Sequence, residues 1–327
     1  MSISEGQEPD GDASAVSDVW TIVVHGGVLP IEGLTEIQID SLKAGLRSAL
    51  QAGAAVLASR GDSLDAVEAA VRVLEDDAQF NAGRGAVMNL DGIYELDAAI
   101  MSGKTGAAGG VAGLRTIKNP ITLARALMND GRHILLAGEG AERFAAGLTD
   151  DKKVEFVSQD YFFDEAMFAE IQQAREAVNL PPLTHPSKRP SHGTVGAVAL
   201  DCHGNLAAAT STGGRTQKLP GRIGDSPIVG AGNYAENGVV AASGTGKGEE
   251  YIRHSATAQV AWFIKYLGLS PDEAVKRVMN QVLPPSAGGM IAVGSRGEVV
   301  MEFTTTAMSR GFAKSDGALE AFVARTQ

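Results

Sequence analysis

The sequence predicts an α+β fold in which helices cover antiparallel sheets. Strand pairs precede and follow helix pairs in each half of the chain, and hairpins stand where β-α-β crossovers would be expected. With 44% hydrophobic residues among 327, the chain can bury a large core. Length alone slightly favours two domains, but the repeated pattern of strand pairs and helix pairs indicates one four-layered unit.

The first half of the chain is expected to alternate strands and helices. A buried strand starts at Trp20 (WTIVV) and runs into a turn at 25–27, because its apolar run meets a Gly pair. Apolar residues at helical spacing then predict two helices, the second capped by Asp62 or Ser63. The remaining expected ranges are 37–59 for the first helix, 94–101 and 105–114 for paired strands, and 120–128, 139–146 and 164–178 for further helices.

A proline-rich linker divides the chain. Residues 179–193 (NLPPLTHPSKRPSHG) hold four prolines and little apolar content, which predicts an exposed connection. Immediately after it, TVGAVALD and NLAAATST predict a hairpin that turns at 202–204. The other elements are expected as a strand at 238–242, helices at 249–267 and 271–282, and a final hairpin at 290–294 and 298–304.

Composition and charge argue against several classes of function. The net charge of −11 opposes binding to nucleic acid or anionic lipid, and 5% aromatic residues are too few for a base-stacking platform. Residues 1–18 carry five carboxylates and no Lys or Arg, which predicts a disordered acidic leader and not a secretory signal. No apolar run predicts a membrane span, and the single Cys202 favours a cytoplasmic protein.

The most informative chemical feature is the junction between Gly193 and Thr194. If this peptide bond is cut, Thr194 becomes a new N-terminus that carries a hydroxyl nucleophile and a free α-amine on one residue. That amine has a reference pKa of ~7.7–8.0, so it can act as a base near neutral pH. Gly193 tolerates the backbone distortion because it lacks a Cβ. On this dipeptide alone, however, the favoured interpretation is a Thr that merely opens a strand.

Longer motifs reverse that preference. In order and spacing over residues 20–311, the chain closely resembles the plant-type asparaginase/isoaspartyl-peptidase family of Ntn-hydrolases. The resemblance is carried by VVHGG, FNAGRGAVMNLDGIYELDAAIM, HGTVGAVALDCHGNLAAATSTGGRTQKLPGRIGDSPIVGAG, SGTGKGEEYIRH and GGMIAVGSRGEVVMEF. It implies a four-layer αββα sandwich as one domain over residues 19–327.

The resemblance also implies an enzyme that activates itself. Self-cleavage would give an α-chain of residues 1–193 and a β-chain of residues 194–327, and a homodimer of the precursor would become an (αβ)2 assembly. The implied activity is hydrolysis of the side-chain amide of L-asparagine and of β-aspartyl (isoaspartyl) dipeptides, which releases L-aspartate. The expected partner is therefore a small molecule or dipeptide, with no nucleic acid and no membrane.

Residues of the catalytic centre are carried over by position. Thr194 matches the family's nucleophile and α-amine base, and the cleavage site lies between Gly193 and Thr194. Thr212, in TSTGG, matches a second Thr that hydrogen-bonds near the nucleophile. Asn81, in FNAGRG, matches an α-chain residue close to it.

Two further pairs are implied to bind the substrate. Thr245 and Gly246 match the hydroxyl and backbone N–H of an oxyanion hole, where each donor is typically worth ~10²–10³ in rate. Arg222 and Asp225, in GRIGDSP, match the pair that binds the substrate's α-carboxylate and α-ammonium. These residue types suit the task, since a guanidinium meets a carboxylate with two parallel hydrogen bonds. Seen alone, such a pair is usually a surface ion pair.

The resemblance implies no cofactor for catalysis, but it does imply a structural sodium ion in the loop after the second helix. Carbonyl ligands leave almost no side-chain trace, so an ordinary acidic loop is the alternative interpretation. The matching ligands are mainly the backbone carbonyls of Leu74, Glu75, Asp77, Phe80, Ala82 and Arg84.

Two segments depart from the family's pattern. HGGAG is usual where this chain has HGGVL, so Val28 and Leu29 replace small residues near the cleavage region. Near the C-terminus, FTTTAMSRG stands where FNTEGMYRG is common. Both departures bear on fine specificity and processing rate, and neither falls on a matched catalytic residue. The substituted positions of the second segment are Thr304, Thr306, Ala307 and Ser309.

Other patterns predict less. SGTGKG fails as a phosphate loop, because Ala241 and Gly248 stand where that motif needs Gly and Ser or Thr. The His residues lack zinc-site spacing, so His25, His192 and His203 are interpreted as turn or structural residues. Two rival functions stay open: a glycosylasparaginase-like hydrolase, disfavoured by HGT in place of HDT, and a non-cleaving, non-enzymatic relative.

Overall fold

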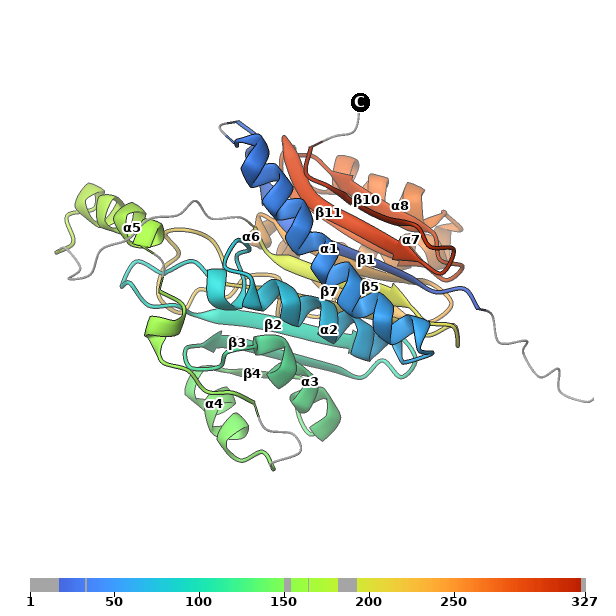
Figure 1. Cartoon of the computed structure of the whole chain (residues 1–327), viewed down its shortest axis with the longest axis horizontal. Helices are drawn as coiled ribbons and strands as arrows, with labels where there is room; N and C mark the ends of the chain where they lie inside the picture. The colour runs from blue at the N-terminus through green and yellow to red at the C-terminus, as the bar shows by residue number, and fades with distance from the viewer. Residues whose placement is uncertain (1–17, 33, 150–153, 164, 182–192, 325–327) are drawn as a thin grey trace, which may run out of the picture.

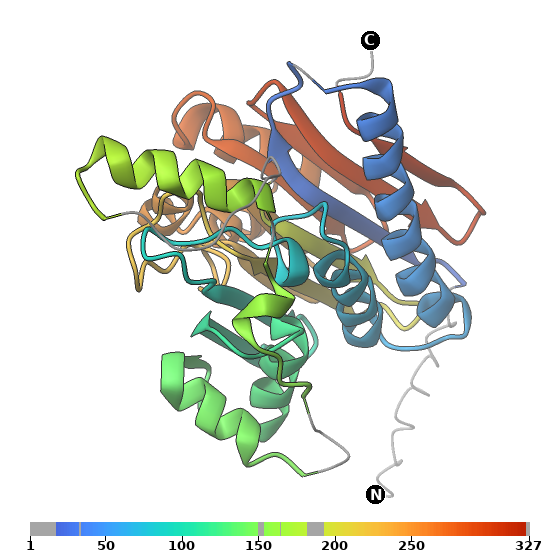
Figure 2. The same ribbon diagram turned by 60° about the vertical axis from the view of Figure 1, so that its left-hand side comes forward.

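The computed structural model describes residues 18–32, 34–149, 154–163, 165–181 and 193–324. Within them, two β-sheets pack face to face between two layers of helices (Figures 1 and 2). Buried apolar residues fill each of the three interfaces between these layers. The predicted four-layer αββα sandwich is therefore confirmed.

The larger sheet carries the strand that follows the cleavage site near its centre. Its strand order is β12-β11-β1-β5-β6-β2-β3-β4. Neighbouring strands are antiparallel except β3 and β4, which run parallel because a helical crossover joins them. The strands are β1 (Thr21–Leu29), β2 (Leu96–Ser102), β3 (Ala108–Leu114), β4 (Leu135–Ala137), β5 (Val195–Leu200), β6 (Leu206–Thr212), β11 (Ala307–Lys314) and β12 (Leu319–Phe322).

The smaller sheet is antiparallel, with the order β10-β9-β8-β7. Residues of β1 show how the large sheet is sandwiched: Val23 packs toward the smaller sheet, whereas Ile22 and Val24 pack in the helix-covered core. Because side chains alternate between faces, a strand buried on both sides reads as a continuous apolar run. The strands of the smaller sheet are β7 (Asn233–Glu236), β8 (Val240–Gly246), β9 (Gly288–Gly294) and β10 (Val299–Phe303).

Helices cover the outer face of each sheet (Figure 1). The first begins at Thr35, whose side chain forms a capping box with Gln38. Helices α1 (Glu36–Ala58), α2 (Ser63–Asp76) and α3 (Pro120–Asp130) cover the larger sheet. Helices α6 (Gly248–His254), α7 (Ala256–Leu267) and α8 (Pro271–Arg277) cover the smaller one. Helix α4 (Gly138–Ala146) follows β4 at the edge of the larger sheet, and α5 (Glu165–Ala177) precedes the linker in the sequence.

The predicted turn at 25–27 is wrong. Strand β1 continues through the Gly pair to Leu29, and a bulge between His25 and Gly27 shifts its register against β11. The bulge accommodates Gly27, whose φ is 95°, a conformation that favours glycine. The Gly pair therefore lies inside the sheet, beside the cleavage site.

Several elements differ from the sequence prediction. Strands β4, β7, β11 and β12 were not expected, and β11–β12 follows the hairpin that was expected to be the last. The expected helix at 249–267 is broken at Ser255, whose φ of 47° ends α6. The last turn of the helix expected at 271–282 is a π-helix from Val278 to Val282.

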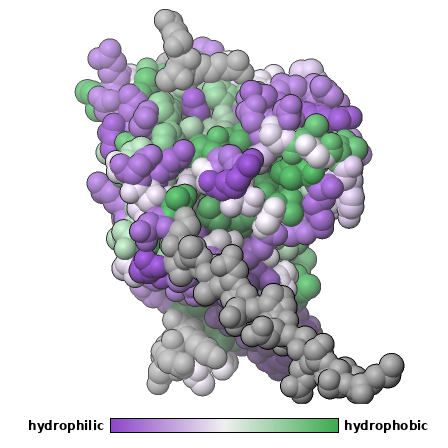
Figure 3. Space-filling model, turned by 90° about the vertical axis from the view of Figure 1, so that its right-hand side faces the viewer, coloured by the Kyte–Doolittle hydropathy of each residue, from purple (hydrophilic) through white to green (hydrophobic). Residues whose placement is uncertain are grey.

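Two predicted segments lie mainly outside the described residues. Of the acidic leader only residue 18 is described, and of the linker only residues 179–181 and 193. In the part of the chain that the structure describes, no helix is long and apolar enough to cross a bilayer. The face in Figure 3 mixes hydrophilic and hydrophobic side chains, and the hydrophobic ones gather near its middle.

Candidate active site

A cavity of about 260 Å³ opens where strands of both sheets end beside the cleavage site. Gly193 and Thr194, which directly precede β5, line it together with Asn81 and Gly246. Thus four of the predicted site residues meet at one cavity, although they come from both sides of the linker. The peptide bond between Gly193 and Thr194 is intact, so this is the geometry of the uncleaved chain.

The two predicted threonines form a direct hydrogen bond. Thr194 Oγ1 donates to Thr212 Oγ1 over 3.0 Å, and both residues are buried. Thr212 Oγ1 also accepts from the N–H of Gly214 over 2.9 Å. Asn81 braces the same turn, because its Nδ2 donates to Gly214 O over 2.7 Å while its Oδ1 accepts from the N–H of Val87. Asn81 thus positions the turn, and within the described residues it forms no hydrogen bond with Thr194.

The hydroxyl of Thr245 points at the peptide unit to be cut. A Cβ added to Gly193 would lie 3.0 Å from Thr245 Oγ1. Thr245 is fully buried, and no described residue hydrogen-bonds its hydroxyl. A buried hydroxyl without a partner costs free energy, so its place beside Gly193 favours a role with substrate or scissile carbonyl.

Close backbone approaches shape the cleavage site. A Cβ on Gly27 would lie 2.3 Å from the carbonyl carbon of Gly193, so β1 packs directly on the bond to be cut. Gly246, with φ at 139°, would collide in the same way with Ala287 O at 2.1 Å. Any side chain at either position would displace the backbone that surrounds Thr194.

Arg222 and Asp225 do not line the cavity, and they do not pair with each other. Arg222 instead donates through Nε and Nη2 to one oxygen of Glu249, over 3.1 and 3.0 Å. Asp225 is buried, and its Oδ2 has no hydrogen-bond partner among the described residues. Burial raises the pKa of the Asp225 carboxyl to about 7, with hydrogen bonding and nearby Arg222 acting against it. Both side chains approach Gly248, just past the end of β8.

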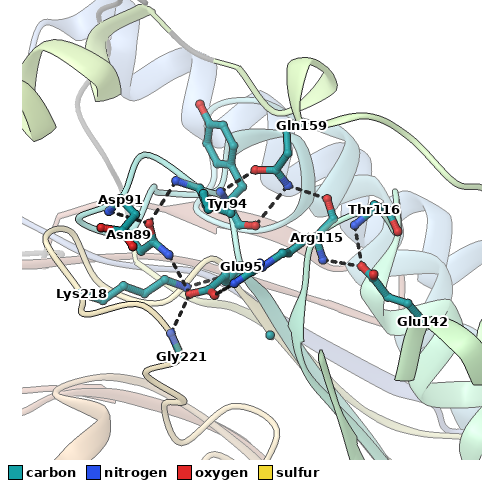
Figure 4. Close-up of polar contacts among 12 residues, drawn as sticks. Asn89, Asp91, Tyr94, Glu95, Arg115, Thr116, Glu142, Gln159, Lys218 and Gly221 are labelled. Atoms are coloured by element: carbon teal, nitrogen blue, oxygen red, sulfur yellow. Dashed lines mark hydrogen bonds and ion pairs between the residues drawn. The ribbon is translucent and has the colours of Figure 1, made fainter. Parts of the chain in front are cut away.

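A buried network holds the loop between β6 and β7, which carries Arg222 (Figure 4). The Glu95 carboxylate accepts from Asn89 Nδ2 over 3.0 Å, from Arg115 Nη2 over 2.8 Å and from the N–H of Gly221 over 3.1 Å. Despite burial, these bonds hold the pKa of Glu95 below its usual value. Lys218 is almost fully buried and donates from Nζ to Glu95 O over 2.6 Å. The loop is thereby tied to the start of β2.

His25 is a structural residue, as predicted, but it lies in a strand rather than a turn. Its ring is fully buried, and Nε2 is 2.9 Å from Ser243 Oγ of the opposite sheet. Ser243 Oγ in turn lies 2.7 Å from Thr210 Oγ1. Burial lowers the pKa of His25 to about 3, although a hydrogen bond with the Thr194 main chain acts to raise it. The ring is therefore neutral at physiological pH.

We expect Ser243→Ala to destabilise the sandwich, because it leaves His25 Nε2 and Thr210 Oγ1 without this buried partner. The expected loss is about 1–3 kcal/mol, measured by urea unfolding of the uncleaved chain. Ser48→Ala is the control, since the Ser48 hydroxyl is exposed on α1 and bonds only to Ala44 O. That variant should stay within about 0.5 kcal/mol of the unaltered chain. Equal losses in both variants would contradict a structural role for the network.

The proposed sodium loop is compatible with a carbonyl-bound cation. It folds back on itself through backbone bonds from the N–H groups of Phe80, Ala82 and Gly85 to the carbonyls of Asp77, Phe80 and Ala82. Each of these carbonyls keeps a second lone pair, and hard cations prefer oxygen ligands. Among the described residues no group of three or more His, Cys, Asp or Glu is arranged to hold a metal ion.

The two departures from the family's pattern meet in space. Leu29 of β1 pairs with Ala307 of β11, and Val28 pairs with Met308. Ser309 Oγ donates to Gly27 O over 3.2 Å. The large side chain of Leu29 thus lies opposite the small side chain of Ala307. Val28 also lines the cavity, with its backbone against Gly193, so this departure does touch the cleavage site.

Seven of the twelve residues that line the cavity were not singled out from the sequence. They lie next to matched residues in the motifs TSTGGRT and SGTGKG or in the loops before β9 and β11. Their proximity to Thr212, Gly246 and Thr304 was the available signal, but the resemblance assigned them no role. The missed residues are Gly214, Arg215, Thr216, Lys247, Ser286, Ala287 and Thr305.

Comparison with known proteins gives the same assignment. A four-layer sandwich whose central strand follows a buried Thr at a cavity defines the class of Ntn-hydrolases. The family model described as asparaginase matches residues 18–323. The chain belongs to this asparaginase family.

Curated relatives match nearly the whole chain. It is 42% identical to an isoaspartyl peptidase of Escherichia coli over 299 residues, which span 89% of this chain and 92% of that protein. It is 40% identical to an isoaspartyl peptidase/L-asparaginase of Bos taurus, over 91% of this chain and 94% of that protein. It is 41% identical to a plant-type L-asparaginase of Pyrobaculum calidifontis, over 90% and 97% respectively.

Proposed function

We propose that this chain cuts itself before Thr194 and then hydrolyses the side-chain amide of L-asparagine and of β-aspartyl dipeptides. The observation that carries the proposal is the position of Thr194. Its buried hydroxyl hydrogen-bonds to Thr212 at the wall of the cavity, directly after Gly193. The names of the relatives, isoaspartyl peptidase and L-asparaginase, supply the substrate class.

Self-cleavage would use the Thr194 hydroxyl as nucleophile. Attack of Oγ1 on the Gly193 carbonyl carbon would form a C–O bond and break the bond to the Thr194 nitrogen, which takes up the hydroxyl proton, so that the peptide bond becomes an ester. Water would then hydrolyse that ester, leaving a carboxylate on Gly193 and a free amine on Thr194. The Thr245 hydroxyl, which lies beside Gly193 and has no hydrogen-bond partner among the described residues, would stabilise the developing oxyanion.

The mature enzyme would repeat this chemistry on a bound side-chain amide. The free amine of Thr194 takes the proton from Oγ1, which attacks the amide carbon. The amine then protonates the leaving nitrogen, which departs as ammonia or as an amino acid. Water hydrolyses the aspartyl ester on Thr194 and releases L-aspartate. The hydrogen bond between Thr194 and Thr212 fixes the direction of the nucleophile.

Arg222 and Asp225 would bind the aspartyl part of the substrate. The substrate's α-carboxylate would replace Glu249 as the hydrogen-bond partner of the Arg222 guanidinium. The substrate's α-ammonium would donate to Asp225 Oδ2, which has no hydrogen-bond partner among the described residues. Pairing with an ammonium favours the ionised form of Asp225, whose pKa burial has raised. Both substrate groups must then be unblocked, so the bond that is cut is the side-chain amide.

Three substrates test this proposal. Ammonia release from L-asparagine and aspartate release from β-Asp-Leu and α-Asp-Leu are measured side by side. We expect turnover of the first two, a higher kcat/KM for β-Asp-Leu, and none for α-Asp-Leu. The β-linked dipeptide should be favoured because it offers contacts that asparagine lacks, and such binding energy can lower the barrier. Cleavage of α-Asp-Leu at a similar rate would reject the roles of Arg222 and Asp225.

The rest of the proposal follows from the resemblance. We infer a mature (αβ)2 assembly, a structural sodium ion in the loop after α2, and a cytoplasmic location, which the single buried Cys202 favours. A glycosylasparaginase-like activity would instead appear as release of the sugar amine from glycosyl-asparagine. A non-enzymatic relative would stay one band on a denaturing gel.

A further inference from the structure

Two cationic side chains line the open cavity without a role in the site described above. Arg215 follows the turn after β6, and Lys247 follows Gly246 at the end of β8. They therefore approach the cavity from different sheets, on loops that carry catalytic residues. Both are exposed, and none of the described residues lining this cavity is acidic.

Neither cation is neutralised by a close partner. Within the described residues, the side chains of Arg215 and Lys247 form no ion pair. Arg215 interacts electrostatically with Glu249, but that carboxylate already accepts two hydrogen bonds from Arg222. Burial works against the charge of Glu249, but its backbone hydrogen bond and the cations Arg222 and Arg215 hold its pKa below the usual value. The cavity beside Thr194 is therefore electropositive.

The proposed binding mode of the substrate indicates which of its groups would lie near these two cations. In the proposed function Arg222 and Asp225 bind the aspartyl carboxylate and ammonium. Neither of these two residues lines the cavity, so these substrate groups would be bound outside it. The part of the substrate left to fill the cavity is the group on the amide nitrogen. In asparagine that group is hydrogen only, whereas in a β-aspartyl dipeptide it is an amino acid that carries a free carboxylate.

We propose that Arg215 and Lys247 form a leaving-group subsite that selects β-aspartyl substrates whose leaving group is anionic, through the α-carboxylate of the released amino acid. This inference rests on the proposed function and narrows its substrate class. Two unit charges about 4 Å apart attract enough in water to change affinity about fivefold, and more where water is partly excluded. Two such cations predict a preference of roughly 10- to 30-fold for a leaving group with a free carboxylate.

A matched pair of substrates tests the subsite. β-Asp-Leu and β-Asp-Leu amide differ only in the leaving group's charge, so the ratio of their kcat/KM values isolates the contact. We expect the enzyme to favour the free acid roughly 10-fold or more, Arg215→Gln and Lys247→Gln each to reduce the ratio several-fold, and the double variant to bring it near unity. About 0.5 M salt should reduce the ratio in the unaltered enzyme but not in the double variant.

Two controls keep the test specific. Lys104→Gln removes one positive charge from an exposed turn outside the cavity, so its ratio should equal that of the unaltered enzyme. Turnover of L-asparagine should change less than about twofold in the cavity variants, because ammonia carries no carboxylate, and this shows that they are folded and self-cleaved. An unchanged acid-to-amide ratio in the double variant would overturn the subsite while leaving the proposed function intact. Absence of turnover with every substrate in the unaltered enzyme would overturn the proposed function, and the subsite with it.

Discussion

Thr194→Ala is expected to remain a single polypeptide of 33.8 kDa under conditions in which the unaltered chain splits in two. Without Oγ1, no hydroxyl lies at the start of β5 to attack the Gly193 carbonyl. The unaltered chain should give a smaller fragment whose N-terminal sequence is TVGAV. Intact-mass measurement after incubation, with N-terminal sequencing of the fragment, decides between these outcomes. Amidase activity should fall to background in the variant, because nucleophile and free amine are both lost.

Thr194→Ser is the matched control, since it restores a hydroxyl on the same backbone and should cleave at the same bond. Thr194→Ala should still fold, because the change removes only one methyl group and one hydroxyl from a residue that is 8% exposed, and a cooperative urea transition checks this. A Thr194→Ala protein that still splits between residues 193 and 194 would remove the basis of the proposed mechanism.

Arg222→Lys is expected to lower kcat/KM for β-Asp-Leu about 10- to 100-fold, although the charge is kept. A guanidinium can bind a carboxylate through two parallel N–H groups, and the lysine ammonium cannot reproduce that fork. Losing one charge-assisted hydrogen bond costs about 1.5–3 kcal/mol, which sets the size of the effect. Steady-state kinetics on the fully cleaved variant measures it. Self-cleavage should persist, since Arg222 lies away from the cavity wall.

Arg253→Lys provides the comparison. Arg253 is also paired with a carboxylate, Glu250 at 3.6 Å, but it lies exposed on α6 outside the cavity. Exposed pairs of this kind contribute little, so its kcat/KM should change less than about twofold. If Arg222→Lys and Arg253→Lys behave alike, Arg222 serves only its ion pair with Glu249.

The sequence alone predicted the layers, which the structure confirms, and the residues of the candidate catalytic centre. Apolar runs such as residues 22–24 predicted buried strands, and the proline-rich linker before Thr194 indicated the predicted cleavage site. These signals are local, because hydrophobic period and chain breaks are properties of short segments. The motif resemblance then placed residues from both sides of the linker in one site, which the cavity beside Thr194 brings together.

Only the tertiary structure decided how those residues are partnered. Arg222 binds Glu249 rather than its motif neighbour, and His25 bonds Ser243 across 218 residues of sequence. The unexpected strand β11 lies against β1, where it brings the two departures from the family's pattern together. Arg215 and Lys247 share a cavity because the ends of two different sheets converge there. Each contact depends on how layers dock and where strands pair, and a one-dimensional pattern of residue types contains no record of either.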